Sequence, residues 1–378
     1  MGVRLPRAQS EEQVAPTDRY LAYMGLRPAR IPHWEHWSCP DAETHLTGID
    51  YYDHPRLCRL RLKELYPVLN LSIPETDDPK PRPDLGAVGR SSNVDDQGRH
   101  FVRWGDGVSG HWDWGRKFTS AEEVFAFSPL AQGDFTDIPV VESQDYSDEE
   151  ALYQKYRARY PAEHGDRAPE GSDASVGFYN TMFMWPMLTF GWELFLETCL
   201  DERFQRVMDE FAEINRRVFR VFARLPVNFV VCHDDIVTSR GPTCSPKWMR
   251  RYIFPRYEEF WGMLKAAGKQ VIFMVDGCID AYADDIFACG ARGIISEPYT
   301  DYKAIARKHK DCFVAGEGDN RVLNTADPAR IERMVRSMLE TAKMTGGYVM
   351  CIGNHIPWNT SPAGIKRYFD LSAELAHR

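Results

Sequence analysis

The chain has little that points to nucleic acid or to a membrane. Its 378 residues carry a formal net charge of −9, whereas a general nucleic-acid binder needs a basic surface to contact phosphates. No apolar stretch approaches the roughly 20 residues that cross a bilayer, and residues 1–7 lack the apolar core of a secretory signal. We therefore expect a cytoplasmic protein with neither nucleic acid nor a membrane as its partner.

Motifs that identify a bound cofactor are also missing. The nine cysteines form no Cys-x-x-Cys pair and their number is odd, which is typical of reduced thiols in a cytoplasm. Neither a Walker loop nor a Gly-x-Gly-x-x-Gly motif after a strand is present. Most of the cysteines should be small buried apolar groups, whereas Cys278 and Cys351 differ because they lie at or near the ends of predicted strands.

What the chain does have is a regular alternation of short apolar runs with helix-length segments. Such alternation predicts right-handed crossovers and a parallel sheet. We expect an α/β fold, first a closed (β/α)8 barrel of the TIM type and second a doubly wound sheet. Eight strands are predicted, at residues 31–34, 68–72, 176–183, 228–233, 270–275, 293–296, 312–315 and 347–352.

The predicted barrel occupies most of the chain. Residues 1–30 are polar without a clear period and are expected to form an N-terminal arm, and residues 31–378 form the barrel. Residues 84–172 are expected to be an insertion or cap, with a hairpin rich in aromatic residues and glycine between positions 99 and 115. A helix from Ser245 to Ala267 has a serine N-cap and a proline in its first turn.

Acidic and imidazole groups follow several of the predicted strands. In a parallel barrel all strands end on one face, so such groups converge there. His233, Asp234 and Asp235 end one strand, and their adjacent acids can hold a proton, a cation or a metal-bound water. Asp276 follows the next strand and can orient substrate or act as general acid or base, although Asp-Gly also favours a simple turn. These four residues are the candidate catalytic groups.

A second set of strand-end groups suits a metal. Glu297, Glu317 and His355, with Cys351, offer the mixed oxygen, nitrogen and sulfur ligands of a zinc site that keeps a position open for substrate. The alternative is surface charge where each loop begins.

Aromatic side chains could form the wall of a substrate pocket. Core packing explains each of them equally well when it is taken singly. Asn354, just past the last strand, joins them as a candidate substrate contact. The aromatic candidates are Trp104, Trp112, Trp114, Tyr179, Phe183 and Trp185.

Several short motifs occur together in a defined order. They are Leu46–Tyr52, Trp104–Gly107, Trp114-Gly115 with Phe118 and Pro129-Leu130, His233–Asp235 with Ser245-Pro246, Val275–Gly277, Gly316–Asp319 and Gly353–Pro357. On these motifs, the chain from about Ile31 to its end resembles the uroporphyrinogen decarboxylase superfamily. That resemblance implies a (β/α)8 barrel whose site lies at the carboxyl ends of the strands.

The resemblance also indicates a branch of that superfamily. Its decarboxylases bind tetrapyrrole carboxylates with an Arg-Gln-Ala-Gly-Arg-Tyr stretch, which is absent here, although Arg27 and Arg30 are present. Its corrinoid-dependent methyltransferases include thiol-methylating members with zinc on His-x-Cys and a later Cys. Met274 and Asp276 stand at the first of these places, and Asn354 or His355 at the second. Substrate-demethylating members use carboxylates and histidine, which suits Glu297, Glu317 and His355.

The resemblance therefore implies a methyltransferase. It would move a methyl group from a methoxylated substrate, expected to be aromatic, to the cobalt of a separate corrinoid protein. Zinc or a protonated acid would activate the leaving oxygen, and the partner would supply the corrinoid because this chain has no binding domain for it. The alternatives are a decarboxylase or lyase acting on a small carboxylated substrate, and a non-catalytic ligand-binding barrel.

Overall fold

A parallel sheet forms the centre of this protein. The computed structural model describes residues 16–37, 39–82, 91–94, 100–103, 110–113, 118–132, 146–178 and 182–376. Six strands pair in the order β13-β12-β11-β10-β7-β6, and β1 pairs with β2 in a further parallel ladder. Their bounds are β1 (His33–Trp34), β2 (Leu69–Asn70), β6 (Ser175–Phe178), β7 (Phe229–His233), β10 (Gln270–Met274), β11 (Gly293–Ile295), β12 (Phe313–Ala315) and β13 (Gly347–Val349).

A parallel bridge from His33 to Met350 joins the two ladders. Eight parallel strands therefore follow one another from β2 through β1 and β13 to β6, and each overlaps one of the eight predicted segments. The predicted α/β class and parallel sheet are confirmed. Within the described part of the chain no pairing joins β6 to β2, so the structure does not show a closed ring.

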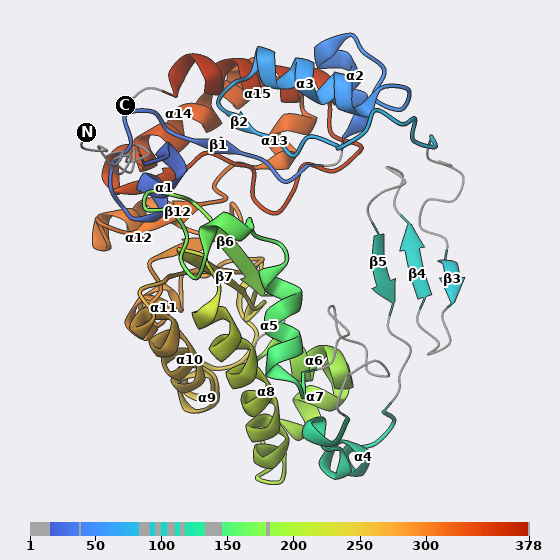
Figure 1. The fold of residues 1–378 in the computed structure, drawn as a ribbon, viewed down its shortest axis with the longest axis vertical. Helices are drawn as coiled ribbons and strands as arrows, with labels where there is room; N and C mark the ends of the chain where they lie inside the picture. The colour runs from blue at the N-terminus through green and yellow to red at the C-terminus, as the bar shows by residue number, and fades with distance from the viewer. Residues whose placement is uncertain are drawn as a thin grey trace, which may run out of the picture.

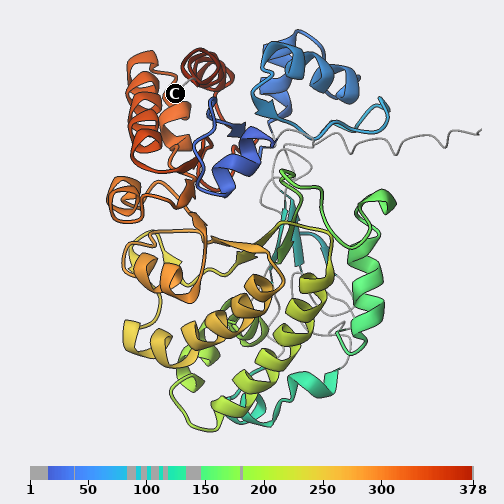
Figure 2. The same cartoon turned by 60° about the vertical axis from the view of Figure 1, so that its left-hand side comes forward.

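Helices surround this sheet (Figures 1 and 2). The longest, α8, buries a stripe that includes Val207, Phe211, Val218 and Phe222, the spacing of an amphipathic helix on a core. In the described residues no helix is both long and apolar enough to cross a membrane. The helices are α1 (Asp18–Tyr23), α2 (Pro40–Thr47), α3 (Pro55–Leu65), α4 (Ala121–Ala126), α5 (Glu149–Arg157), α6 (Met184–Phe190), α7 (Trp192–Thr198), α8 (Phe204–Arg224), α9 (Pro246–Tyr252), α10 (Phe254–Ala266), α11 (Ala283–Cys289), α12 (Tyr302–Lys308), α13 (Asn320–Asn324), α14 (Pro328–Met344) and α15 (Pro362–Leu375), with short 3-10 turns at Pro129–Gln132 and Ala162–His164.

The helix predicted from Ser245 to Ala267 is two helices. Ser245 caps the first of them as expected, since its hydroxyl accepts from the backbone N–H of Trp248 at 3.3 Å. The chain then breaks at Ile253, and α10 begins with Pro255 in its first turn. Proline disfavours a helical conformation for the residue before it and has no N–H to donate, so the break was readable from the sequence.

Residues between positions 91 and 113 form an antiparallel sheet. It consists of β3 (Ser91–Val94), β4 (His100–Arg103) and β5 (Gly110–Asp113), and the pairing of β4 with β5 confirms the predicted hairpin. Figure 1 shows this sheet to one side of the parallel strands. The division of the chain into an arm, a barrel and a cap stays a prediction.

The two faces of the parallel sheet carry separate apolar clusters. Val230, Phe273 and Val314 belong to the large cluster that includes the helices, whereas Phe229, Ile272, Phe313 and their inward-facing neighbours form a smaller one. This separation follows from strand geometry, because successive side chains point to opposite faces.

Helix α1 covers the amino-terminal ends of the strands. The Tyr23 ring lies 5.0 Å from Phe229 and 4.8 Å from Phe313, both in edge contacts. These aromatic contacts fill that end of the sheet with apolar groups. Polar side chains on the inward face gather at the opposite, carboxyl end.

Candidate active site

Three ligand-type side chains meet at the carboxyl ends of β7 and β10. His233 is the last residue of β7 and pairs in register with Met274 of the neighbouring β10. Asp276 comes two residues after Met274, so its side chain lies on the same face of the sheet as that of His233. One donor atom from each of His233, Asp235 and Asp276 lies within 4.8 Å of the others. We call these three residues the triad.

Direct hydrogen bonds hold the triad in place. His233 Nε2 lies 3.0 Å from Asp235 Oδ1, and the backbone N–H of Asp276 donates to the same oxygen at 2.8 Å. Gly277 follows with φ of 119°, and a Cβ there would lie 2.6 Å from the carbonyl of Thr238. Only glycine permits this backbone approach, which lets the chain after β10 pack closely on the chain after β7.

The charges of the site favour an added cation or proton. Burial, then the charges of Asp235 and Glu297, raise the pKa of Asp276 to about 7, although His233 opposes the shift. Burial lowers the pKa of His233, but the hydrogen bond and charge of Asp235 raise it overall. Burial also raises the pKa of Glu297. Carboxylates outnumber the imidazole here, so they resist full ionisation unless positive charge is present.

Residues after β13 and β1 complete this end of the sheet. Asn354 donates its side-chain amide to Asp276 Oδ2 at 3.1 Å, and its Oδ1 lies 2.9 Å from Nδ1 of His355. The ring of His355 lies 5.8 Å from that of His36, and burial lowers the pKa of His36. Asn354 has φ of 61°, a left-handed backbone conformation that residues other than glycine adopt at an energetic cost.

Asp234, a predicted catalytic group, points away from the triad. It is fully buried, and its carboxylate accepts from the backbone N–H groups of Phe183 and Met184 and from the hydroxyl of Tyr257. Alternation along the strand sends it to the helix side. Asp234 therefore holds the start of α6, and the structure does not bring it to the site.

The predicted metal ligands divide into two pairs. Glu297 and His355 reach the carboxyl end of the sheet beside Asn354. Glu317 instead accepts from Thr341 of α14 at 3.0 Å and from Tyr348 at 2.9 Å. Cys351 lies in the inward apolar cluster, where burial raises its pKa well above the usual value and keeps the thiol protonated, the form that does not bind metal.

A turn explains the position of Glu317. Strand alternation alone would put it on the inward face, level with Asp276 and Glu297. Gly316 interrupts that alternation with φ of 98°, so close to the backbone of Ser296 that no Cβ fits there. The chain turns, and Glu317 faces α14.

The predicted aromatic wall is only partly described. Trp104, Trp114 and Tyr179 lie outside the described residues, and Trp112 is placed only as part of the β5 backbone. Phe183 is fully buried among Trp192, Phe195 and Trp248, and Trp185 is also a core residue. Of the predicted substrate contacts, Asn354 alone is seen at the site in the described part of the chain.

The triad was identified residue by residue in the sequence but not as a ligand set. The available signal was His233-x-Asp235, because positions i and i+2 share one face of a strand. Asp276 was the corresponding group after the next strand. The predicted ligand set is instead Glu297, Glu317, His355 and Cys351, and among the described residues the structure does not bring these four together.

Comparison with known proteins agrees with this architecture. A methyltransferase structure from Methanosarcina mazei has 14% sequence identity and a TM-score of 0.55, and the match covers 94% of this chain and 97% of that one. An uncharacterized protein has 15% identity and a TM-score of 0.27, covering 44% of this chain and 45% of that one. A xylose isomerase-like TIM barrel protein from Mycobacterium smegmatis, solved with magnesium, has 10% identity and a TM-score of 0.26, covering 68% and 98%. The last two scores are too low to support an argument.

No curated protein sequence matches this chain. The family model described as Uroporphyrinogen decarboxylase (URO-D) matches residues 193–375, which include β7, β10 and all three triad residues. Residues 193–375 of this chain are therefore similar to the uroporphyrinogen decarboxylase family.

Proposed function

We propose that this protein is a corrinoid-dependent methyltransferase, the component that removes a methyl group from a methoxylated aromatic substrate. The methyl group passes to the cobalt of a separate corrinoid protein. The observation that carries the proposal is the triad, whose nitrogen and oxygen donors lie within 4.8 Å of one another at two neighbouring strand ends. The fold shared with a methyltransferase supports the reaction class.

The triad fits a zinc ion by its chemistry. One imidazole nitrogen and two carboxylate oxygens are three protein ligands, which leave the fourth zinc position open for substrate. The raised pKa of Asp276 marks a site that gains from positive charge. Zinc there would act as a Lewis acid on the ether oxygen.

The protein's own groups would position the substrate and supply a proton. In the transfer step the bond between oxygen and the methyl carbon would break, and the methyl group would pass to the reduced cobalt that the partner would supply. The electron pair of the broken bond stays on the oxygen, which leaves as a phenolate. Glu297 is the proton donor in this proposal, because burial raises its pKa and it lies beside Asn354. His36, whose pKa is lowered by burial, has its ring 5.8 Å from that of His355.

The proposal takes the eight parallel strands to be a closed (β/α)8 barrel, with β6 and β2 as neighbours. The carboxyl ends of the strands then surround the triad, and the corrinoid protein docks over them. In that arrangement the substrate lies between the triad and the cobalt. Its ether oxygen faces the triad, and its methyl group faces the cobalt.

Metal analysis combined with a transfer assay tests the proposal. The purified protein should contain close to one zinc per chain, and His233→Ala and Asp276→Asn should lose most of it. Asp284→Asn is the matched control, because Asp284 is exposed on α11 and pairs with Lys308 and His309. With a reduced corrinoid protein and a methoxylated arene, the unchanged enzyme should produce a methylated corrinoid and a phenol.

Other outcomes would identify the alternatives. Carbon dioxide released from a carboxylated substrate, without zinc, would identify a decarboxylase. Saturable ligand binding with no turnover would indicate a binding barrel. If both triad variants retained zinc, His233 and Asp276 would not be the zinc ligands.

A further inference from the structure

A basic hollow lies at the other end of the strands from the triad. Its volume is about 780 Å³, and its lining includes Asn228 and Lys269, the residues immediately before β7 and β10. The carboxyl ends of α8 and α10 border it. Three cationic side chains, Arg167, Arg224 and Lys269, line the hollow together with one acid, Asp166.

Lys269 is a buried charge without a carboxylate partner among the described residues. Lys269 is only 6% exposed. Its ammonium donates to the carbonyls of Leu225 at 2.6 Å and Val227 at 3.0 Å. Burial lowers its pKa to about 8. Lysine is almost never fully buried unless it is paired. The two carbonyl bonds use two of its three N–H donors, so one donor remains for a ligand.

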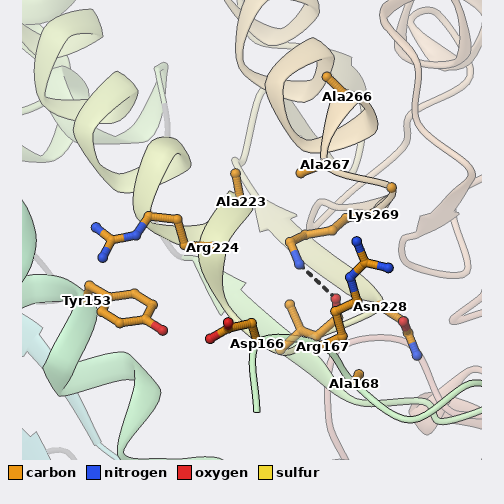
Figure 3. A pocket seen from close by; sticks show the side chains of 12 residues that line it. Tyr153, Asp166, Arg167, Ala168, Ala223, Arg224, Asn228, Ala266, Ala267 and Lys269 are labelled. Atoms are coloured by element: carbon orange, nitrogen blue, oxygen red, sulfur yellow. Dashed lines mark hydrogen bonds between the residues drawn. The ribbon is translucent and has the colours of Figure 1, made fainter. Parts of the chain in front are cut away.

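The two arginines contribute differently. Arg224 is engaged, since it donates to Glu150 at 2.7 Å and lies 4.1 Å above the Tyr153 ring. Arg167 is exposed and forms no ion pair with the described acids. Figure 3 shows Arg167 and Asn228 on one side of Lys269 and Tyr153 and Arg224 on the other.

Helix ends and nearby acids offset most of the positive charge of the hollow. The carboxyl end of a helix carries about half a negative charge. The ends of α8 and α10 together with Asp166 therefore offset about two of the three positive charges, and Glu150 pairs with Arg224. The net charge is then about zero, but Lys269 and Arg167 have no carboxylate partner among the described residues, and they lie in a concave site of the size that small ligands occupy.

We propose that this hollow binds the phosphate group of a small phosphorylated ligand, with Lys269 and Arg167 as the direct donors. Arginine forms two parallel hydrogen bonds with a phosphate, and lysine adds a point charge. The terminal oxygens of a phosphate point in different directions, so one oxygen can accept from the buried Lys269 while another accepts from the exposed Arg167. This site does not depend on the triad or on methyl transfer.

Calorimetric titration of the full chain with inorganic phosphate at pH 7 tests the proposal, with sodium chloride at equal ionic strength as the reference. Phosphate should bind saturably and raise the midpoint of thermal unfolding, because a ligand of the folded state stabilises it. Arg167→Gln should weaken binding about tenfold, the loss of about 1.4 kcal/mol. Arg159→Gln, the same change at an exposed arginine outside the hollow, should leave binding unchanged.

Lys269→Met should abolish binding. If that variant does not fold, the comparison of Arg167→Gln with Arg159→Gln decides alone. Binding should also weaken at pH 9, where Lys269 is mostly neutral. No saturable heat beyond the chloride reference, or equal binding by the two arginine variants, would overturn the site. Malonate binding as tightly as phosphate would overturn the assignment to phosphate.

Discussion

Asn354 donates to Asp276 at 3.1 Å, across 78 residues of sequence. The bond links the loop after β13 to the end of β10, and Asn354 keeps a left-handed φ of 61° to make it. Backbone strain of this kind persists where the surrounding structure imposes it, commonly at functional sites. Asn354 therefore orients a triad carboxylate from the other side of the site.

Replacing Asn354 should separate strain from positioning. Asn354→Ala and Asn354→Gly both remove the amide, so zinc affinity should fall about tenfold or more, the usual loss of an outer hydrogen bond to a metal ligand. Glycine tolerates the positive φ, so Asn354→Gly should be about 1 kcal/mol more stable than Asn354→Ala. Chelator competition measures the affinity, and urea unfolding measures the stability. Unchanged zinc affinity in both variants would show that Asn354 does not position Asp276.

Asp234 should prove to be a structural residue. Asp234→Ala leaves the two backbone N–H groups and the Tyr257 hydroxyl without their buried acceptor, so we expect a loss of about 3 kcal/mol or more in unfolding free energy. Tyr257→Phe removes one of these donors and should cost less. Asp209→Ala, at a half-exposed acid, serves as the control. Equal stability of Asp234→Ala and Asp209→Ala would contradict this assignment.

The buried Glu317 predicts an unusual dependence of stability on pH. Burial raises its pKa from 4.5 in the unfolded chain to about 7, although bonds from Tyr348 and Thr341 oppose the shift. The folded protein therefore holds a proton that the unfolded chain releases, and stability falls as pH rises from about 4.5 to about 7. The full loss corresponds to a few kcal/mol.

Glu317→Gln removes this titration. The variant should be more stable than the unchanged protein at pH 8, and the difference should shrink toward pH 5. Glu340→Gln provides the control, since Glu340 is exposed on the same helix that Glu317 faces. Denaturant unfolding at several pH values gives the comparison, and a difference that does not vary with pH would refute the buried charge.

Gly277 should not tolerate a side chain. An added Cβ would meet the Thr238 carbonyl at 2.6 Å, and φ is 119°. We expect Gly277→Ala to cost at least about 2 kcal/mol and to separate the triad. Gly262→Ala is the matched control, because Gly262 is helical and nothing lies within 4 Å of the added Cβ. That control should stabilise the protein by about 0.5–1 kcal/mol. Similar effects of the two substitutions on unfolding would argue against the close approach.

The local pattern of the sequence determined the strands and the acids that follow them. Runs such as Val271–Val275 are apolar on both faces, as buried parallel strands are, and polar groups were predicted where each run ends. His233 and Asp276 were named on that basis. The break at Pro255 is also a local signal, and the single helix predicted from Ser245 to Ala267 is wrong there.

Only the tertiary structure decided which of these polar groups share a site. Neighbouring residues on a strand face opposite ways, so His233 and Asp235 join Asp276 while Asp234 binds the start of α6. A left-handed glycine turned Glu317 toward α14, and Asn354 reached Asp276 from a loop far along the chain. The direction of a side chain beyond a strand end depends on the backbone turn and on the neighbouring elements that contact it, and neither is encoded in the local period of the sequence.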